Sequence, residues 1–275
     1  MRHFIPTVIA TLVAASPALA LDQAGEQSTA IRPAPPSRSA EFLTGIEYEE
    51  GKYGTAQKVE TVSIPTSLRV SAGRIQLTAT LPYVRIDAPG NVVGGGGGGI
   101  LGLPIIVDPT RPATRDRREG IGDLRLGAAY TVPSTSLGLT FMGQMKVPTA
   151  SERKRLGTGK IDYMVGAELS KSFGGITPFA SVAYTIAGDP QGYDLRNSIS
   201  ARGGLAAQIG EKVRGHISYG YAQSLSRLVP DEQQISTGIN AGLSDRLSLG
   251  LYGSAGLSRG APDIGAGMQV GLRLF

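Results

Sequence analysis

The sequence predicts an all-β fold, an antiparallel transmembrane β-barrel of about twelve strands and of the outer-membrane type. Three observations predict it: apolar residues at every second position, connections that alternate between short and long, and the lack of a segment suited to a spanning helix. Leu247, Leu249 and Leu251, for example, alternate with Ser248 and Gly250. Period two is typical of strands with one apolar and one wet face, and runs of such strands are typical of outer-membrane barrels.

The bulk composition fits one large barrel and gives no sign of a second domain. The chain has 275 residues, of which 39 are glycine, with 41% hydrophobic residues and a net charge of +5. After residue 20 it contains no stretch of about 18 uncharged apolar residues, the length that a spanning helix needs. Cysteine is absent. Disulfides, thiolate nucleophiles and cysteine metal sites are therefore excluded, and closed strand pairing must hold the fold together.

Three parts are expected along the chain. Residues 1–20 have the pattern of a cleaved secretory signal peptide, with Arg2 before an apolar run and small residues at Ala18 and Ala20. Residues 21–40 are rich in Pro, Ser and Ala, which predicts a disordered periplasmic leader or, alternatively, a segment that enters the barrel. Residues 41–275 are expected to form the transmembrane barrel.

Alternation defines the strands of this barrel. A tilted strand needs roughly 9–11 residues to cross a bilayer, and most of the segments reach that length. The expected strands are 42–48, 58–70, 74–86, 120–132, 137–147, 161–172, 177–187, 196–209, 213–224, 234–244, 247–258 and 263–274. With both ends of the chain in the periplasm, the tight turns fall on the periplasmic side and the longer connections fall outside.

Each strand has one face for lipid and one for the lumen. Leu139, Phe141 and Val165 lie in the phase that meets lipid, whereas the polar and charged residues lie in the other phase. Such charges are costly to bury in a soluble core without partners, and a wet lumen removes that difficulty. The residues expected to line the lumen and set its selectivity are Asp123, Arg125, Gln144, Lys146, Asp162, Glu168, Arg202, Arg214 and His216.

Local departures from the pattern give further expectations. Pro65 lies inside an expected strand and predicts a bulge, because proline removes a ladder hydrogen bond. Phe275 is out of phase with the lipid-facing residues that end at Leu274, so the terminal aromatic assembly signal is imperfect or the register shifts. Aromatic residues near strand ends predict a thin interfacial girdle. They are Tyr83, Tyr130, Tyr163, Phe179, Tyr184, Tyr219 and Tyr221.

The connection 87–119 is much longer than ordinary connections. It contains six glycines at 94–99, but no Lys-Ser/Thr pair follows them, and Gly157 to Lys160 precede Ile161 where a phosphate-binding loop needs a hydroxyl. Nucleotide binding is therefore not expected, and the glycines are interpreted as flexible loop with an apolar patch at 100–107 that folds into the mouth. The connection is a lid that selects solutes or, equally, a mobile exterior loop.

The outer connections are also basic. Guanidinium groups pair well with phosphate, so these residues are expected to contact lipopolysaccharide, with a merely solvated charge run as the alternative. The basic patch consists of Arg115, Arg117, Arg118, Arg153, Lys154 and Arg155.

Three segments carry a family resemblance. They are Glu119 to Gly127, Lys146 to Thr149, and Leu156 to Asp162. Together they resemble the outer-membrane transporter family of the phenol-degradation (MetA) pathway, over most of the mature chain. The shared residues are glycine and aspartate at strand ends rather than chemical groups in a catalytic pattern. The resemblance implies a barrel and, for its cargo, small and rather hydrophobic organic solutes.

The predicted function is an outer-membrane channel or uptake protein for small, hydrophobic or aromatic organic solutes that cross by passive diffusion. Twelve strands lie between about eight, where side chains fill a barrel, and about sixteen to eighteen, where water fills it, so a narrow or gated lumen is expected. The alternative is a non-conducting structural or surface-interaction barrel of the outer membrane.

An enzyme is not expected. His216 is the only histidine after the signal peptide, and a single lumen histidine fits neither a lipid-facing hydrolase nor a two-histidine metal site. Neither a cofactor nor a metal ion is expected. The expected partners are outer-membrane lipid and lipopolysaccharide, a small organic solute and the barrel-assembly machinery, and nucleic acid is not among them.

Overall fold

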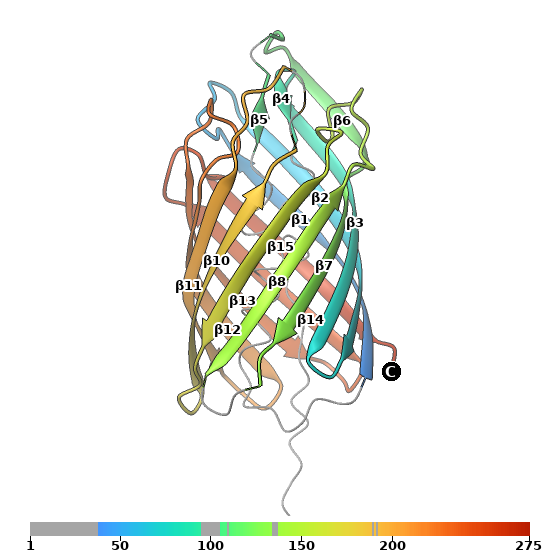
Figure 1. Cartoon of the computed structure of the whole chain (residues 1–275), viewed down its shortest axis with the longest axis vertical. Helices are drawn as coiled ribbons and strands as arrows, with labels where there is room; N and C mark the ends of the chain where they lie inside the picture. The colour runs from blue at the N-terminus through green and yellow to red at the C-terminus, as the bar shows by residue number, and fades with distance from the viewer. Residues whose placement is uncertain (1–37, 95–104, 109, 134–136, 189, 191) are drawn as a thin grey trace, which may run out of the picture.

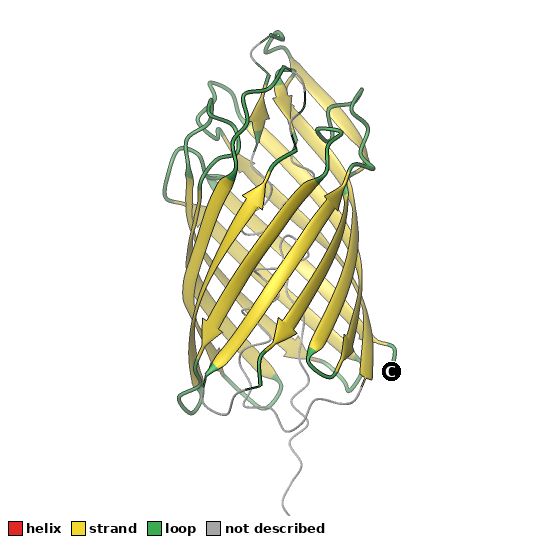
Figure 2. Ribbon diagram, viewed as in Figure 1, coloured by secondary structure: helices red, strands yellow, loops and turns green. Residues whose placement is uncertain are grey.

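The described part of the chain forms one closed β-barrel with tilted strands and contains no helix (Figure 2). The structure is a computed structural model that describes residues 38–94, 105–108, 110–133, 137–188, 190 and 192–275. The expected signal peptide and the leader up to residue 37 lie outside the described residues, as do the glycines from 95 onward and the apolar patch up to 104. In the described part of the chain, no helix is long and apolar enough to cross a membrane.

Fifteen strands make up the described structure. Their bounds are β1 Arg38–Gly51, β2 Val59–Ala72, β3 Ile75–Pro89, β4 Val92–Val93, β5 Ile106–Val107, β6 Arg115–Ile121, β7 Leu124–Thr131, β8 Gly138–Val147, β9 Asp162–Ser170, β10 Ile176–Ile186, β11 Ser198–Gln208, β12 Val213–Ala222, β13 Glu232–Gly242, β14 Leu247–Gly256 and β15 Ile264–Arg273.

The strands pair antiparallel with their neighbours in sequence, and β1 pairs with both β2 and β15 to close the ring (Figure 1). β6 and β7 both pair with β3, at different heights, so together they serve as one barrel strand. The barrel therefore has twelve strands, as the sequence predicts. The small β4–β5 hairpin stands apart from it at one end.

A β-bulge separates β6 from β7. Tyr83 pairs with Ile121 and Thr80 pairs with Arg125. Between these pairs, two residues of β3 lie opposite the three residues 122–124. The strand formed by β6 and β7 therefore has one extra residue, as in a bulge. Bulges bend a strand and redirect side chains, and this one lies among the interior charges described below.

The bulge predicted at Pro65 is wrong. Pro65 lies opposite Pro82 in an unbroken β2–β3 register. On the other side, β1 residues up to Thr44 and from Glu47 onward follow the same register, with a gap in the pairing between them. The proline therefore removes ladder pairing locally, as a missing N–H must, but it inserts no extra residue.

The two faces of the barrel wall differ as predicted. Apolar side chains of the outward phase are exposed, such as Phe141 at 52% and Val165 at 58%. Polar and charged residues of the other phase are buried inside. Phe179, however, points inward and is 6% exposed, so its predicted place in the aromatic girdle is wrong. Its strand is in phase with the buried Thr177 and Ser181, which places its ring on the lumen side.

Short and long connections lie at opposite ends. The tight turns, including 73–74 and 209–212, lie at the end where the chain terminates, and the long connections gather at the other end, here called the mouth (Figure 1). β1 begins at Arg38, so residues 38–40 belong to the barrel and not to the expected leader. At the closing edge Leu274 N donates to Ala40 O at 2.8 Å, and Phe275 beyond it is 68% exposed.

The connection predicted at 87–119 is shorter than expected. β3 continues to Pro89 and β6 starts at Arg115, so this hairpin extends upward as paired strand. Opposite charges across it support the pairing, since Arg85 Nε lies 2.7 Å from Glu119 Oε2 and Arg115 Nε lies 2.6 Å from Asp87 Oδ1. Cross-strand charge pairs are stabilising in antiparallel sheets, which explains why so polar a segment forms strands.

Candidate functional site

The candidate site is the interior of the barrel. Eight of the nine residues that the sequence assigns to the lumen lie on the inner phase of their strands, and Asp123 lies at the bulge between β6 and β7. Six are buried, from Asp123 and Glu168 at 0% and 1% to Asp162 at 8%, and the other three are half-buried. The buried ones are Asp123, Arg125, Lys146, Asp162, Glu168 and Arg202. The half-buried ones are Gln144, Arg214 and His216.

Four of these residues meet at the β6–β7 bulge. Arg125, Lys146 and Asp162 are successive register partners across β7, β8 and β9. Lys146 Nζ lies 2.7 Å from Asp162 Oδ2 and 3.5 Å from Asp123 Oδ2. It also lies 3.1 Å from the hydroxyl of Thr158, to which it donates. A buried ammonium group with these partners avoids the cost of an unpaired interior charge.

The same cluster fastens the connection 148–161 to the barrel. The hydroxyl of Thr149 donates to Gly122 O at 2.8 Å and accepts from Leu124 N at 2.8 Å, so it bridges the bulge. Ala150 N donates to Asp123 Oδ1 at 3.0 Å. These bonds satisfy backbone groups that the bulge takes out of the ladder. The connection therefore folds back onto the barrel wall at this point.

Two glycines are required in this connection. A Cβ on Gly157 would lie 2.7 Å from Asp123 Oδ2 and 2.9 Å from Ala150 Cβ, so a side chain does not fit. Gly159 has φ of +69°, a left-handed conformation that favours glycine. The segments that carry the family resemblance, 119–127, 146–149 and 156–162, thus converge in space. We call this interlocked group of Asp123, Lys146, Thr149, Gly157 and Asp162 the latch.

A second polar group lies on β10 to β13. Arg202 Nε donates to Ser218 Oγ at 2.9 Å, and Ser218 Oγ lies 2.7 Å from Ser236 Oγ. The Arg202 guanidinium carbon stands 5.7 Å from the centre of the Phe179 ring, within the range of a cation–π contact. These contacts hold the guanidinium group against the wall of the barrel.

Arg214 and His216 lie closer to the end with short turns. Arg214 Nε and Nη2 donate to Gln208 Oε1 at 3.3 and 3.2 Å. His216 pairs in register with Gly238, and a Cβ on that glycine would lie 2.5 Å from His216 Cε1. The histidine ring therefore packs against Gly238.

Apolar side chains pack together at the mouth. β3 contributes Val84 and Ile86, and the connection 148–161 contributes Leu156, all 2% exposed or less. Burial also raises the pKa of the Tyr53 phenol well above its usual range. We call the group the mouth cluster; it consists of Tyr53, Val59, Val84, Ile86, Ala88, Val92, Ile105, Ala150 and Leu156.

Of the apolar patch predicted at 100–107, Ile105 belongs to the mouth cluster, but sequence reasoning missed the residues that the strands and the other connections contribute. Along β3 the apolar residues lie in the outward phase up to Leu81 and in the inward phase from Val84 onward. This change of phase at Pro82 was the available signal. Before the proline the apolar side chains of β3 therefore point outward to lipid, and after it they point inward to the mouth cluster.

The basic patch is divided between outside and inside. Arg115, Arg117, Arg153 and Lys154 are exposed and Arg155 is half-buried. Arg118 is 5% exposed and its Nη1 donates to Val92 O at 2.8 Å, so its expected place on the outer surface is wrong. The alternation of β6 turns it inward, where it supports the short β4–β5 hairpin.

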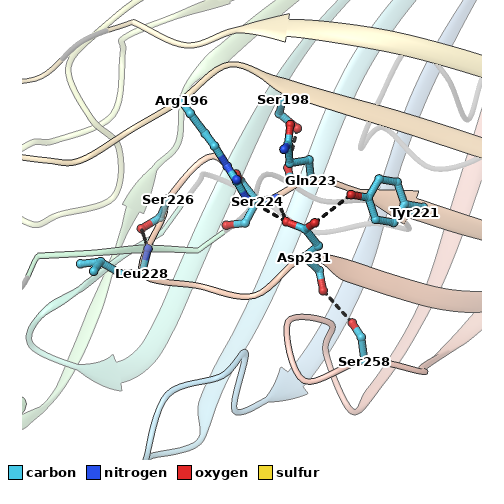
Figure 3. Close-up of polar contacts among 9 residues, drawn as sticks. All are labelled: Arg196, Ser198, Tyr221, Gln223, Ser224, Ser226, Leu228, Asp231 and Ser258. Atoms are coloured by element: carbon cyan, nitrogen blue, oxygen red, sulfur yellow. Dashed lines mark hydrogen bonds and ion pairs between the residues drawn. The ribbon is translucent and has the colours of Figure 1, made fainter.

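Asp231 links three connections elsewhere around the mouth. Asp231 accepts from Arg196 Nη2 at 2.9 Å, from Tyr221 OH at 2.8 Å and from Ser224 N at 3.0 Å (Figure 3). Its carbonyl accepts from Ser258 Oγ at 2.8 Å. One residue therefore joins the connections 187–197, 223–231 and 257–263, and fixes the rim around the mouth.

Comparison with known protein families agrees with this architecture. The sequence profile described as "Putative MetA-pathway of phenol degradation" matches residues 53–274. The chain belongs to this family. The match includes all three segments of the latch and all of the barrel after β1. No curated protein matches the sequence.

Solved structures with the same fold are outer-membrane barrels. The COG4313 outer membrane channel from Pseudomonas putida F1 superposes with a TM-score of 0.65 at 13% identity, over 89% of this chain and 100% of that one. The KdgM porin gives 0.53 at 6% identity, over 84% and 98%. The translocator domain of the autotransporter NalP from Neisseria meningitidis gives 0.50 at 10% identity, over 86% and 88%. At these identities the likeness establishes the fold.

Proposed function

We propose that this family member is a channel of the bacterial outer membrane through which small, hydrophobic or aromatic organic solutes cross by passive diffusion. The long connections would face outward and the turns would face the periplasm. A cleaved signal peptide at residues 1–20 would direct export, and the barrel-assembly machinery would insert the chain. No catalytic role is proposed.

The mouth cluster is the observation that carries this proposal. It places apolar side chains such as Val84, Ile86 and Leu156 across the entrance to an interior with buried charged groups. An apolar solute that parts these side chains, which are at most 2% exposed, would exchange contacts with water for contacts with them, which is favourable. A strongly hydrated solute would lose hydration there without compensation. The entrance would therefore favour hydrophobic and aromatic molecules.

Beyond the entrance, we propose that the polar interior sets selectivity. The solute would pass the nine lumen residues named above, of which Gln144, Arg214 and His216 are the less buried ones. The exposed part of the basic patch, Arg115, Arg117, Arg153 and Lys154, would contact lipopolysaccharide phosphates. Arg115 and Arg155 already have acidic partners, Asp87 and Asp116, so the others carry most of this contact.

A second candidate is a non-conducting structural or surface-interaction barrel. The observation in its favour is the depth of burial of interior charges, with Asp123 and Glu168 at most 1% exposed. An interior packed so tightly around its ion pairs would exclude solutes, as in small barrels filled by side chains.

Uptake by whole cells distinguishes the two candidates. Cells that produce the protein and matched cells without it would be given a radiolabelled aromatic alcohol or a disaccharide of the same specific activity. The proposal predicts that production of the protein raises the initial uptake of the alcohol several-fold but not that of the disaccharide. Equal uptake of the alcohol in both strains, with a folded heat-modifiable band present in the outer membrane, would support the non-conducting barrel.

A further inference from the structure

Gln234 is an interior glutamine whose amide has no partner in the described part of the chain. Its side chain is 1% exposed, and neither its Oε1 nor its Nε2 atom has a hydrogen-bond partner among those residues. It lies on β13 between the outward-phase residues Gln233 and Ile235, so it points to the interior. A buried amide without partners loses its hydration without compensation, at a cost that native proteins rarely bear.

The strands beside Gln234 offer its amide no hydrogen-bonding side chain. Its register partners are glycines, Gly220 on β12 and Gly256 on β14. The connection 257–263 folds over Gly256, since a Cβ on that glycine would lie 2.2 Å from Pro262 O and 3.0 Å from Ala261 Cβ. Ala261 is 1% exposed. Gln234 thus lies beside a roof that Ala261 and Pro262 form over Gly256.

Neighbouring hydroxyl groups do not satisfy the amide. Ser236, two residues along β13, is engaged with Ser218 at 2.7 Å, and Ser218 accepts from Arg202 Nε at 2.9 Å. These three side chains form a chain of hydrogen bonds beside Gln234 that does not include it. The Oε1 acceptor and the Nε2 donor of Gln234 both therefore lack a partner in the described part of the chain, and both can bond to one bound molecule.

We propose that Gln234 is a solute-binding residue of the interior, and that its amide recognises the hydroxyl group of an uncharged solute. A hydroxyl group both donates and accepts, so it complements the Oε1 and Nε2 atoms together. The amide carries no charge and is matched by a neutral hydroxyl group, whereas binding governed by the nearby Arg202 guanidinium would favour an anion such as benzoate. The apolar roof at Ala261 and Pro262 fits the hydrocarbon part of the same molecule.

This inference deepens the proposed function and rests on it for its biological meaning, but its test is independent of transport. The refolded full-length protein in detergent micelles would be heated with and without benzyl alcohol, toluene or benzoate, and unfolding followed by far-UV circular dichroism. Toluene lacks only the hydroxyl group of benzyl alcohol, and benzoate carries a charge. The inference predicts that benzyl alcohol raises the midpoint temperature relative to toluene and benzoate by about 2–4 °C.

Two variants locate the effect. Gln234→Leu keeps the approximate volume and removes the amide, so without solute its midpoint stays the same or rises, because a buried group without partners is gone. The variant loses the response to benzyl alcohol. Gln76→Leu is the matched control, because Gln76 is also buried, at 6%, but lies on β3, far along the sheet from β13. It retains the response.

Three results would overturn the inference: a response to benzyl alcohol that survives in Gln234→Leu, a stronger response to benzoate or toluene, or a fall of several degrees in the midpoint of Gln234→Leu without solute. The last result would show that the amide has a partner. A normal benzyl alcohol response combined with no uptake by cells would instead reject the channel and leave the binding residue in place.

Discussion

The ammonium group of Lys146 serves two carboxylates inside the barrel, with its Nζ atom 2.7 Å from Asp162 Oδ2 and 3.5 Å from Asp123 Oδ2. Asp123 lies before the connection 148–161 in sequence, at the β6–β7 bulge, and Asp162 lies directly after it, at the start of β9. Lys146 therefore joins the two ends of the latch, and the connection between them depends on it.

Replacing Lys146 by methionine leaves both carboxylates buried without their cation. Breaking a buried ion pair in this way costs about 3–5 kcal/mol. We expect the temperature at which the folded band is lost in SDS gels to fall by many degrees. Lys160→Met is the control, since Lys160 is exposed at the end of the same connection. Equal midpoints for both variants would contradict the role of Lys146 in the latch.

Gly157→Ala tests the fit of the latch. Its new Cβ would lie 2.7 Å from Asp123 Oδ2, so the carboxylate or the connection must move. We expect a cost of about 1–3 kcal/mol, as for overpacking elsewhere, measured as a lower midpoint of thermal unfolding. Gly203→Ala is the matched control, because its Cβ would come no closer than 3.8 Å to another atom. A midpoint unchanged by Gly157→Ala would show that the latch is loose.

Leu156→Ala tests whether the mouth cluster restricts flow. Leu156 is 0% exposed, and its truncation removes contacts at the entrance. We expect a higher mean ionic current through the protein in a planar bilayer. Leu228→Ala, at a leucine that is 49% exposed in another outer connection, should leave the current unchanged. A current that does not rise in Leu156→Ala would mean that the mouth cluster is not the constriction.

Asp231→Ala tests whether Asp231 holds the connections of the mouth together (Figure 3). The variant loses its bonds to Arg196, Tyr221 and Ser224, so the connection 223–231 should open more often. Local opening exposes the chain to proteases. We expect trypsin to cleave after Arg227 several-fold faster in proteoliposomes than in the wild type. In Asp245→Ala, which changes an exposed turn at the other end, trypsin should cleave at the wild-type rate. Equal rates for both variants would contradict the role of Asp231 in holding the connections together.

Much of the fold could be predicted from the sequence because strand alternation is a local signal. Each side chain at a lipid-facing or interior position reports its own face, which is why all twelve barrel strands and the inward phase of residues such as Lys146 and Glu168 follow from period two. The bulge at 122–124 could not be predicted in this way. A bulge is an extra residue relative to the neighbouring strand, and alternation along one strand does not show how that strand pairs with its neighbour.

The parts of the site that depend on contacts between distant segments were also beyond the sequence. The mouth cluster joins β3 to three connections, and the latch joins residues from 123 to 162 through side chains that sequence spacing does not relate. Phe179 and Arg118 were placed on the wrong side because aromatic and basic residues near strand ends usually face outward. Here the phase of their strands turns them inward.

Planar-bilayer conductance of the refolded protein tests the central claim, that this barrel is a channel, most directly. If the barrel is a channel, the wild type gives discrete and reproducible single-channel currents, and these currents are larger when Leu156 is truncated. No reproducible current from either protein, in preparations whose folded band migrates differently from the boiled one in SDS gels, would contradict the channel and favour a non-conducting barrel.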